Sequence, residues 1–417
     1  MMGEIPPKPE DLEKLKVSIV KFLSSEVLTP SLVALPLIVA AADTRFSVAN
    51  AAELSLRRMD SAVDWNSNSV FAPIYILFLG TLTPQDKTAP DKFKNPANTR
   101  IRLKLMPYLL KSKEAANYTP LAVKVFFECL WGQNSNSKLR QQGVSFLHHT
   151  TFNAEKKNLS HVGTVLFDGV VKVIEEEKQD DKLRSLAYGA LAKLSLKLPN
   201  LLLSHSSQLY YLQVLMDALT QEVGDVLLAL QEALSMLAPV CQELSPSSQD
   251  QLCVLLSDHV LHHNPQLRRT AVHYAASVFP PSHVPSRYIL MIATGDIQDD
   301  IRLEARRQLY KSIGEEKDGT LLYETPPFKA VISYVMERVN ALPRVKWLEV
   351  ANQPIPFSVT IMEQMIHYLE HCLNVEALGT TYREGHLLWE KSPEIGRLVN
   401  KILTQHKEAT DANTIEG

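Results

Sequence analysis

Hydrophobic residues recur every three or four positions over long stretches of this chain, which is the period of an α-helix that buries one face. The clearest case runs from Leu183 to Leu198, with Leu or Ala also at positions 186, 187, 190, 191 and 194. Asp180 or Asp181 is placed to cap this helix, and Pro199 is placed to end it. About eighteen such stretches can be counted, and no alternating strand pattern competes with them.

A short helical phrase returns five times between Asn136 and Ala305. Its small residue lies at Gly143, Ala187, Ala229, Ala271 and Ala305, at spacings of 44, 42, 42 and 34 positions. In four copies an arginine precedes the small residue by three positions, and we expect it to reach toward the turns between repeats: Arg140, Arg184, Arg268 and Arg302. In the third copy that arginine position holds Val226, so the ladder is broken there. This period is typical of two-helix repeats that stack into a solenoid.

The sequence therefore predicts an all-α fold, an α-solenoid of HEAT-like two-helix repeats that runs continuously over 1–417. Two long loops are expected, near 80–98 and near 314–327, because both stretches are polar and lack the helical period. In the unit from about 209 to 240, Asp225 is expected to cap the second helix. The first helix, near Leu12 to Leu23, has the character of an internal repeat. We therefore expect an apolar surface to be exposed at one or both ends.

Charge and composition narrow the class of partner. The 417 residues carry 43 basic and 46 acidic side chains, a net charge of −3. This balance argues against a nucleic-acid partner and against a polybasic membrane contact. The longest apolar runs, Leu32–Ala42 and Val70–Leu79, are shorter than the ~20 residues of a membrane span. We expect no integral membrane segment, and a location in the cytoplasm and nucleus.

Candidate chemistry is sparse. The four cysteines are widely spaced, form no Cys-x-x-Cys pair, and are expected to be reduced core residues: Cys129, Cys241, Cys253 and Cys372. No nucleophile elbow and no phosphate-binding glycine motif occurs. Neither catalytic residues nor a metal site nor a cofactor is predicted. The four tryptophans are more often core residues than interface anchors: Trp65, Trp131, Trp347 and Trp389.

One group of residues, which contains two histidines, could in principle form an enzyme site. His367 and His371 lie four residues apart on one predicted helix face, next to Cys372. A zinc protease would need Glu after the first histidine, and that position holds Tyr368. A surface or capping role is favoured for these residues, and a hydrolase that uses them stays an alternative of another class. The histidine pairs at 148–149 and 262–263, and His259, are expected at the C-terminal ends of helices. A charged imidazolium there would interact favourably with the helix dipole.

Several longer strings resemble one known family. In order along the chain they are Val39–Ala49, Asp64–Asn66, Gly132–Arg140, Gln231–Met236, and Phe279–Tyr288 running to Gly295-Asp296. Their order and spacing closely resemble the N-terminal region of the proteasome adapter and scaffold family, very large HEAT-repeat proteins. The resemblance covers roughly residues 12 to 403, although the chain is several-fold shorter than a full member of that family.

The resemblance implies a non-catalytic adaptor. Such a protein would bind the regulatory and core particles of the proteasome, support their assembly, stability or quality control, and link them to other cellular components. The alternative is a HEAT-repeat trafficking or transport scaffold with other protein clients. No individual protein-binding residue follows from the resemblance. The loop Gly80–Asn98 is our candidate contact site, because projecting solenoid loops often bind partners.

Overall fold

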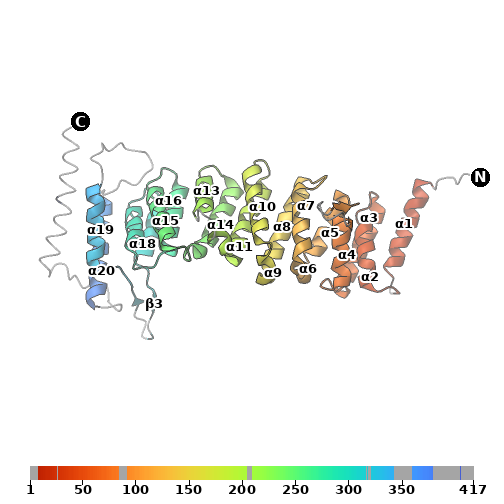
Figure 1. Cartoon of the computed structure of the whole chain (residues 1–417), viewed down its shortest axis with the longest axis horizontal. Coiled ribbons are helices and arrows are strands. Elements are labelled where there is room, and N and C mark those ends of the chain that lie inside the picture. The colour runs from red at the N-terminus through yellow and green to blue at the C-terminus, as the bar shows by residue number, and fades with distance from the viewer. Residues whose placement is uncertain are drawn as a thin grey trace, which may run out of the picture. The chain divides into compact units, whose positions relative to one another are not determined.

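The computed structural model describes residues 8–25, 27–83, 92–203, 209–315, 317, 321–341, 359–378 and 404. Over these residues the chain forms twenty α-helices, a single 3₁₀ turn and four strands of two or three residues (Figure 1). Paired helices follow one another along the chain, and their inward faces form the core. The prediction of an all-α, HEAT-like α-solenoid is confirmed.

The chain divides into two compact units. Unit 1 comprises Met1–Leu201 and Gly224–Ala233, and unit 2 comprises Leu202–Val223 and Leu234–Gly417. Two helices, α12 (Asn200–Leu203) and α14 (Gly224–Cys241), contribute residues to both units. The prediction of one continuous array over 1–417 stays a prediction.

Unit 1 is built from helix pairs. The first helices of the pairs are α2 (Pro30–Ala40), α4 (Asn68–Leu79), α7 (Thr119–Trp131) and α10 (Gly163–Glu176). Their second helices are α3 (Phe46–Met59), α5 (Thr99–Leu109), α8 (Ser137–Asn153) and α11 (Asp181–Lys197). Second helices also stack on one another, α5 on α8 and α8 on α11. The remaining elements are α1 (Pro9–Leu23), the 3₁₀ turn (Asp60–Ala62), α6 (Lys113–Asn117) and α9 (Lys156–Ser160).

Unit 2 repeats the same plan. Helix α15 (Pro246–His259) packs on α16 (Pro265–Ser277), and α17 (Val284–Ala293) packs on both α16 and α18 (Asp299–Leu309). Helices α19 (Phe328–Ala341) and α20 (Val359–Leu378) pack on each other and on α17. The unit also holds α13 (Tyr210–Ala218).

Capping side chains explain where several second helices begin. Asn98, Asn136 and Asp180 each accept a hydrogen bond from the backbone N–H three residues later. Each cap satisfies a donor that a helix start leaves open. The prediction for Asp180 is confirmed, and α11 ends at Lys197, just before Pro199. The prediction for Asp225 is wrong, since α14 begins at Gly224 and has no side-chain cap.

The small residues of the repeated phrase let helices approach closely. A Cβ added at Gly143 would lie 2.5 Å from the Cβ of Cys129 on α7, closer than two carbon atoms tolerate. Ala187, Ala271 and Ala305 are fully buried. Ala229 is only half-buried, however, which shows that the third copy is aligned one residue too early.

Burial corrects that alignment. The residue before the arginine is buried in the other copies, as Leu139, Leu183, Leu267 and Ile301. In α14 the buried position is Val226, so Leu227 rather than Val226 occupies the arginine position, and the buried Leu230 occupies the small position. The series of arginines is interrupted in α14 as expected, but at Leu227, one residue later than the match with Ala229 indicated.

Both predicted long loops contain short antiparallel hairpins that the sequence analysis missed. Strands β1 (Thr81–Thr83) and β2 (Lys92–Lys94) pair with Thr83 opposite Lys92, and β3 (Gly314–Glu315) pairs with β4 (Leu321–Leu322). Strands of two or three residues are too short to show an alternating pattern.

One described helix, α14, is long and apolar enough to cross a membrane by length and composition alone. Its residues 226, 230, 233, 234, 237 and 238 are buried. These positions repeat every three or four residues, which is also the pattern of a core helix in a helical array. Counting uninterrupted apolar runs overlooked this helix, because Asp225, Gln231 and Glu232 interrupt it.

Candidate protein-binding surfaces

Arg140 and Arg268 of the repeated phrase bind turns of the neighbouring repeat, as predicted, whereas Arg184 forms an ion pair with Asp181 of its own helix. Arg140 on α8 forms an ion pair of 2.5 Å with Glu177, in the turn before α11. The backbone N–H groups of Gln179 and Asp180 and the charge of Arg140 hold the pKa of Glu177 below its ordinary value. Arg102 on α5 is not part of the phrase, but it also contacts the next pair: it donates to the carbonyl of Phe78 on α4 and forms an ion pair of 3.3 Å with Glu128 on α7.

The most buried member of the ladder is Arg268 in unit 2. Its Nε and Nη2 donate to the two carboxylate oxygens of Asp296, at 2.7 and 2.9 Å, and neither side chain is exposed. Its Nη1 donates to the carbonyls of His262 and His263, which follow α15, at 3.0 Å each. Arg302 on α18 donates in turn to the carbonyl of Asp296. This network ties the turn that follows α15 to the turn between α17 and α18, so its role is structural.

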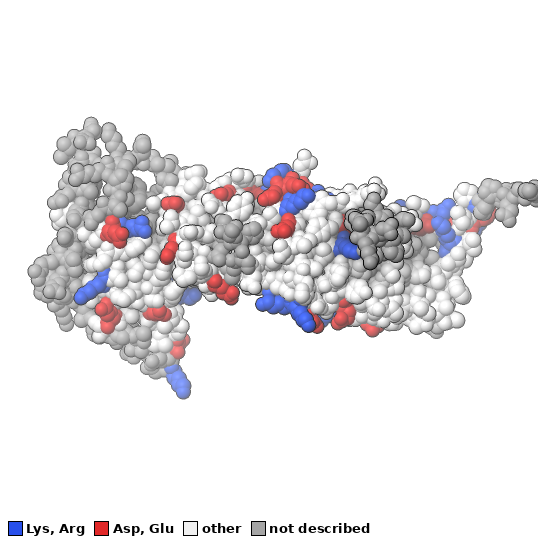
Figure 2. Space-filling model, in the orientation of Figure 1, with Lys and Arg blue, Asp and Glu red and all other residues white. Residues whose placement is uncertain are grey.

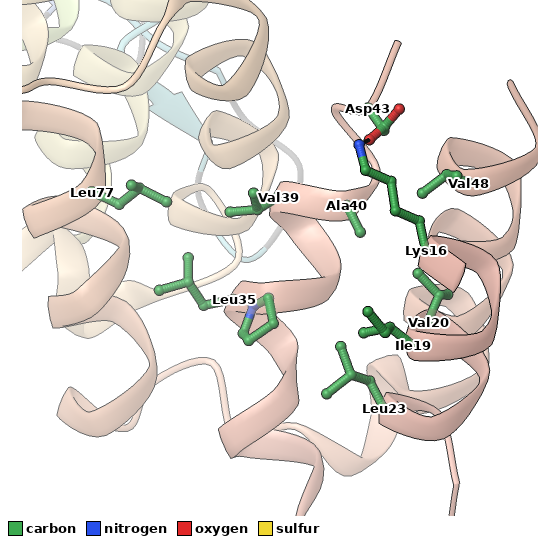
Figure 3. Close-up of a pocket in the computed structure, with 11 residues that line it drawn as sticks. Lys16, Ile19, Val20, Leu23, Leu35, Val39, Ala40, Asp43, Val48 and Leu77 are labelled. Carbon is green, nitrogen blue, oxygen red and sulfur yellow. Dashed lines mark hydrogen bonds and ion pairs between the residues drawn. The ribbon is translucent and has the colours of Figure 1, made fainter. Parts of the chain in front are cut away.

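An apolar groove of about 540 Å³ opens in unit 1 over the outward side of α2. Ile19, Val20 and Leu23 of α1 form one wall and face Ala40 of α2 across the opening (Figure 3). Leu35 and Val39 of α2 and Leu77 of α4 continue the apolar lining away from α1, and Val48 of α3 also contributes.

A single ion pair marks one end of this groove. Lys16 Nζ lies 2.5 Å from the Asp43 carboxylate (Figure 3). Burial by itself would raise the pKa of Asp43, but hydrogen bonds from Lys16 and from the Arg45 N–H lower it below its ordinary value. Since the two charges neutralise each other, the groove presents an almost uncharged lining to a ligand.

Helix α1 buries a different side from the one its sequence pattern indicates. Its apolar residues do share one face, but Leu15, Ile19 and Phe22 are 56%, 48% and 61% exposed, and only Val20 is buried. The prediction of an exposed apolar surface therefore agrees with this end of unit 1. Figure 1 shows α1 as the last helix of the row that continues into α2 and α3.

The hairpin of β1 and β2 is held at its base by the neighbouring helices. Ala97 N–H donates to the carbonyl of Leu77 on α4, and Asn98 caps α5. Residues 84–91, between the two strands, lie outside the described residues. The described parts of the candidate contact site Gly80–Asn98 thus form a pair of strands anchored to α4 and α5.

The tryptophans divide between core and surface. Trp65 is buried and packs on Tyr108, which agrees with a core role. Trp131, at the end of α7, is instead 36% exposed, stacks on Phe127 with ring centroids 5.5 Å apart, and carries Lys172 Nζ 5.1 Å from its ring. Trp347 and Trp389 lie outside the described residues.

The hydrolase candidates on α20 are not arranged for catalysis. His371 is buried among the rings of Tyr310 and Tyr323, and burial lowers its pKa to about 4. Burial also raises the pKa of Cys372 to about 12, so the thiol stays protonated at neutral pH. His367 is exposed and lies near Glu370. The expectation of a surface or capping role is wrong for His371, because the tyrosines of α18, α20 and the β4–α19 connection enclose it.

His148 and His259 also lie at or near helix ends, but burial changes their charge. His259 is the last residue of α15, and burial lowers its pKa. His148, in the last two turns of α8, donates a hydrogen bond from Nε2 to the Leu186 carbonyl, and its pKa is also lowered by burial. These rings are therefore neutral at physiological pH, and the predicted interaction of an imidazolium with the helix dipole is wrong for them.

Metal-ligating residues do not cluster in the described parts of the chain. No group of three His, Cys, Asp or Glu residues there could hold a metal ion. All four cysteines are free and buried. On the face seen in Figure 2, basic and acidic side chains are interspersed over the described residues, without a broad basic area.

Comparison with known proteins identifies relatives by sequence. The model of a family described as proteasome component ECM29, N-terminal, matches residues 2–293. The human proteasome adapter and scaffold protein ECM29 is 32% identical over 425 residues, which span all of this chain and 23% of that protein. The proteasome-associated protein ECM29 homolog of Drosophila melanogaster is 25% identical over 98% of this chain and 24% of its own length. The chain thus spans about a quarter of the length of these relatives.

Comparison of structures returns other helical proteins. A crystal structure of importin beta aligns with 98% of this chain and 45% of its own chain, at 12% identity and a TM-score of 0.45. An engineered protein aligns over 96% of both chains, at 13% identity and the same TM-score. Because both TM-scores are below 0.5, the fold assignment rests on the helix pairs observed in this chain itself.

Proposed function

The chain belongs to the family of ECM29 proteasome components, and on that premise we propose that it is a non-catalytic adaptor that binds the proteasome. The observation that carries the proposal is the family match over residues 2–293, together with a human relative named as a proteasome adapter and scaffold. The proposed partners are the regulatory and core particles. The proposed location is the cytoplasm and nucleus.

The proposed mechanism is the display of surface features on a stiff frame. Arg102, Arg140 and Arg268 each join one helix pair to the next, Arg102 through its ion pair with Glu128 on α7. Such links hold exposed hairpins and helix faces at set positions along a repeat array. By supporting contacts on more than one subunit, the adaptor would favour the assembly, stability or quality control of the proteasome and its linkage to other components. No bond is made or broken.

A pull-down tests the proposal directly. The tagged 417-residue chain would be purified from cell lysate, and proteasome subunits would be quantified by mass spectrometry. Enrichment of regulatory and core subunits together is expected. Recovery of soluble chain without proteasome would refute binding by this part of the family, and recovery of transport receptors or their cargo instead would favour the trafficking scaffold.

The β1–β2 hairpin is the proposed contact site. Because Thr83 pairs with Lys92, residues 84–91 can be replaced by Asn-Gly, which closes a two-residue turn on the existing strands. This variant should capture less proteasome than the unaltered chain while melting at the same temperature. Undiminished capture would remove the hairpin from consideration. A matched change in the β3–β4 hairpin serves as control.

A further inference from the structure

The basic side chains of unit 1 are concentrated on the second helices of its pairs. Helices α3, α5, α8 and α11 together carry eleven lysines and arginines but only two acidic residues. The first helices α2, α4, α7 and α10 carry two basic and four acidic residues. The net charge of −3 for the whole chain therefore conceals a separation of charge between the two kinds of helix.

Five of the eleven basic residues have structural partners. Four form ion pairs with carboxylates, and Lys197 donates to backbone carbonyls at the end of α8. The other six are exposed and pair with no carboxylate of the described residues; we call them the basic face: Arg57, Arg58, Arg100, Lys138, Lys182 and Lys193. Two of the six bond to neutral acceptors, Arg100 to the carbonyl of Asp43 and Lys193 to Nδ1 of His148. These bonds leave the charge of the face unneutralised.

Helix stability does not account for these cations. Arg100, Lys138 and Lys182 are each the second residue of their helix, on α5, α8 and α11. The dipole makes the N-terminal end of a helix positive, so a cation in the first turn is unfavourable there. Side chains that oppose local stability at the same position of three successive second helices indicate a role in binding rather than in folding.

The spacing of these three cations indicates the shape of a ligand. Helix α5 packs on α8 and α8 packs on α11, and packed helices lie about 8–10 Å apart. In a polyproline II chain every third side chain points the same way, at intervals of about 9 Å. An extended segment of about seven residues, with an acidic side chain at every third position, can therefore reach all three cations.

The carboxylates nearest this row already have partners. In the turn before α11, Glu177 pairs with Arg140, and Asp180 accepts hydrogen bonds from Ser137 and Gln141. On the earlier pair of second helices, Glu53 of α3 pairs with Lys104 of α5 and shows that a carboxylate can bridge two of them. Lys138 and Lys182 remain available to pair with carboxylates of a ligand.

From these observations we propose that the basic face binds an extended acidic segment of a partner protein. Its acidic side chains pair with Arg100, Lys138 and Lys182, and the other cations of the face attract acidic residues on either side of them. This inference does not rest on the adaptor function proposed above.

A nucleic acid fits the basic face less well. Each strand carries one phosphate about every 3.4 Å, which is about three phosphates for each cation in the row. The same four helices also expose apolar side chains, Leu54 on α3, Phe152 on α8 and Leu196 on α11. Apolar neighbours suit the side chains of a polypeptide better than they suit a phosphate backbone.

The test uses the full chain and a labelled acidic probe. The probe is a fluorescein-labelled peptide of four Glu-Pro-Ser repeats, because proline favours the polyproline II form and the repeat puts glutamate at every third position. Fluorescence anisotropy in about 50 mM salt should show saturable binding with a Kd on the order of 100 µM. Raising the salt to about 300 mM should weaken binding about tenfold or more, because exposed charges are screened. The same peptide with glutamine in place of glutamate should not bind.

Charge reversal places the binding on the basic face. Lys138→Glu combined with Lys182→Glu changes two exposed positions where the helix dipole favours an anion, and should weaken binding about tenfold or more. Lys156→Glu combined with Lys157→Glu makes the same change of net charge at the start of α9, outside the second helices. This control should alter the Kd by less than about twofold. Thermal melts of both variants verify that the chain remains folded.

Three results would overturn the proposal. The first is the absence of binding at about 1 mM peptide, or equal binding of the glutamine peptide. The second is an equal loss of affinity in the two double variants, since the peptide would then respond to net charge and not to the basic face. The third is a labelled oligothymidine that binds about tenfold more tightly than the peptide and depends on Lys138 and Lys182, which would assign the face to nucleic acid. Because none of these measurements involves the proteasome, failure here leaves the proposed adaptor function standing.

Discussion

Replacing Arg268 with methionine should destabilise unit 2 strongly. The substitution keeps the aliphatic stem but removes two charge-assisted hydrogen bonds to Asp296 and two hydrogen bonds to the carbonyls of His262 and His263. The Asp296 carboxylate then stays in a site with no solvent access, where the N–H of Gln298 still donates to it. Removing one partner of a buried ion pair costs about 3–5 kcal/mol.

Hydrogen exchange measured by mass spectrometry is the appropriate assay, because local opening in a repeat array need not follow a single global transition. Amides of α16 and α18 should exchange at least about a hundredfold faster in Arg268→Met, as a cost of 3 kcal/mol implies. Arg269→Met is the matched control, since the adjacent arginine pairs with Asp300 on the surface, with 43% and 54% of the side chains exposed. The control should change stability by at most about 1 kcal/mol.

A double variant separates the buried charge from the lost packing. Arg268→Met combined with Asp296→Leu removes both charges, and should cost less than Arg268→Met alone because no unpaired carboxylate remains. A cost for Arg268→Met below about 1 kcal/mol would refute the reasoning. So would a double variant whose cost equals the sum of the two single costs, since the residues would then be energetically independent.

Two further predictions concern packing and pH. Gly143→Ala should lower the melting temperature of unit 1, because its Cβ would overlap that of Cys129, and overpacking of about 1–3 kcal/mol outweighs the ~1 kcal/mol that alanine gains in a helix; a higher melting temperature would contradict the close approach. Burial lowers the pKa of His371 to about 4, whereas an unfolded histidine titrates near 6.5, so the unfolded state binds more protons between these values. Its stabilising effect is therefore complete above pH 6.5 and is lost as the pH falls toward 4, by at most about 3 kcal/mol. Urea midpoints measured across this range should show the loss, and His371→Phe should remove it; an unchanged slope would show that His371 does not cause it.

Helix existence could be read from the sequence, because a three-to-four-residue apolar period and a capping side chain act within one or two turns. The stretch from Leu183 to Leu198 and its Asp180 cap are the clearest example. The contacts of Arg140 and Arg268 with inter-repeat turns could also be predicted from the repeat, because a residue at the same place in each second helix lies beside the same kind of turn. The period could not show that His371 is enclosed, because Tyr310 and Tyr323 approach it from segments about sixty and fifty residues away, respectively.

The third copy of the phrase shows a different limit. Ala229 matched the small residue by identity, but burial of Val226 and Leu230 places the contact one residue later. A close helix contact requires a particular position on the helix face, and α14 satisfies it with larger side chains. With Leu227 in the arginine position, the ladder is interrupted in the one second helix that the two units divide between them.

Helix α1 shows why the sequence could predict only part of the apolar groove. The spacing of the apolar residues 12, 15, 19, 22 and 23 correctly indicated a helix with one apolar face, but it could not show which of them a neighbouring helix covers. Which side of a helix is covered depends on its neighbours, however, and α1 uses Val20 for its contact while Leu15, Ile19 and Phe22 remain exposed. Apolar residues on an uncovered face lower solubility without stabilising the unit. The same excess occurs on α2, whose outward side adjoins the same groove.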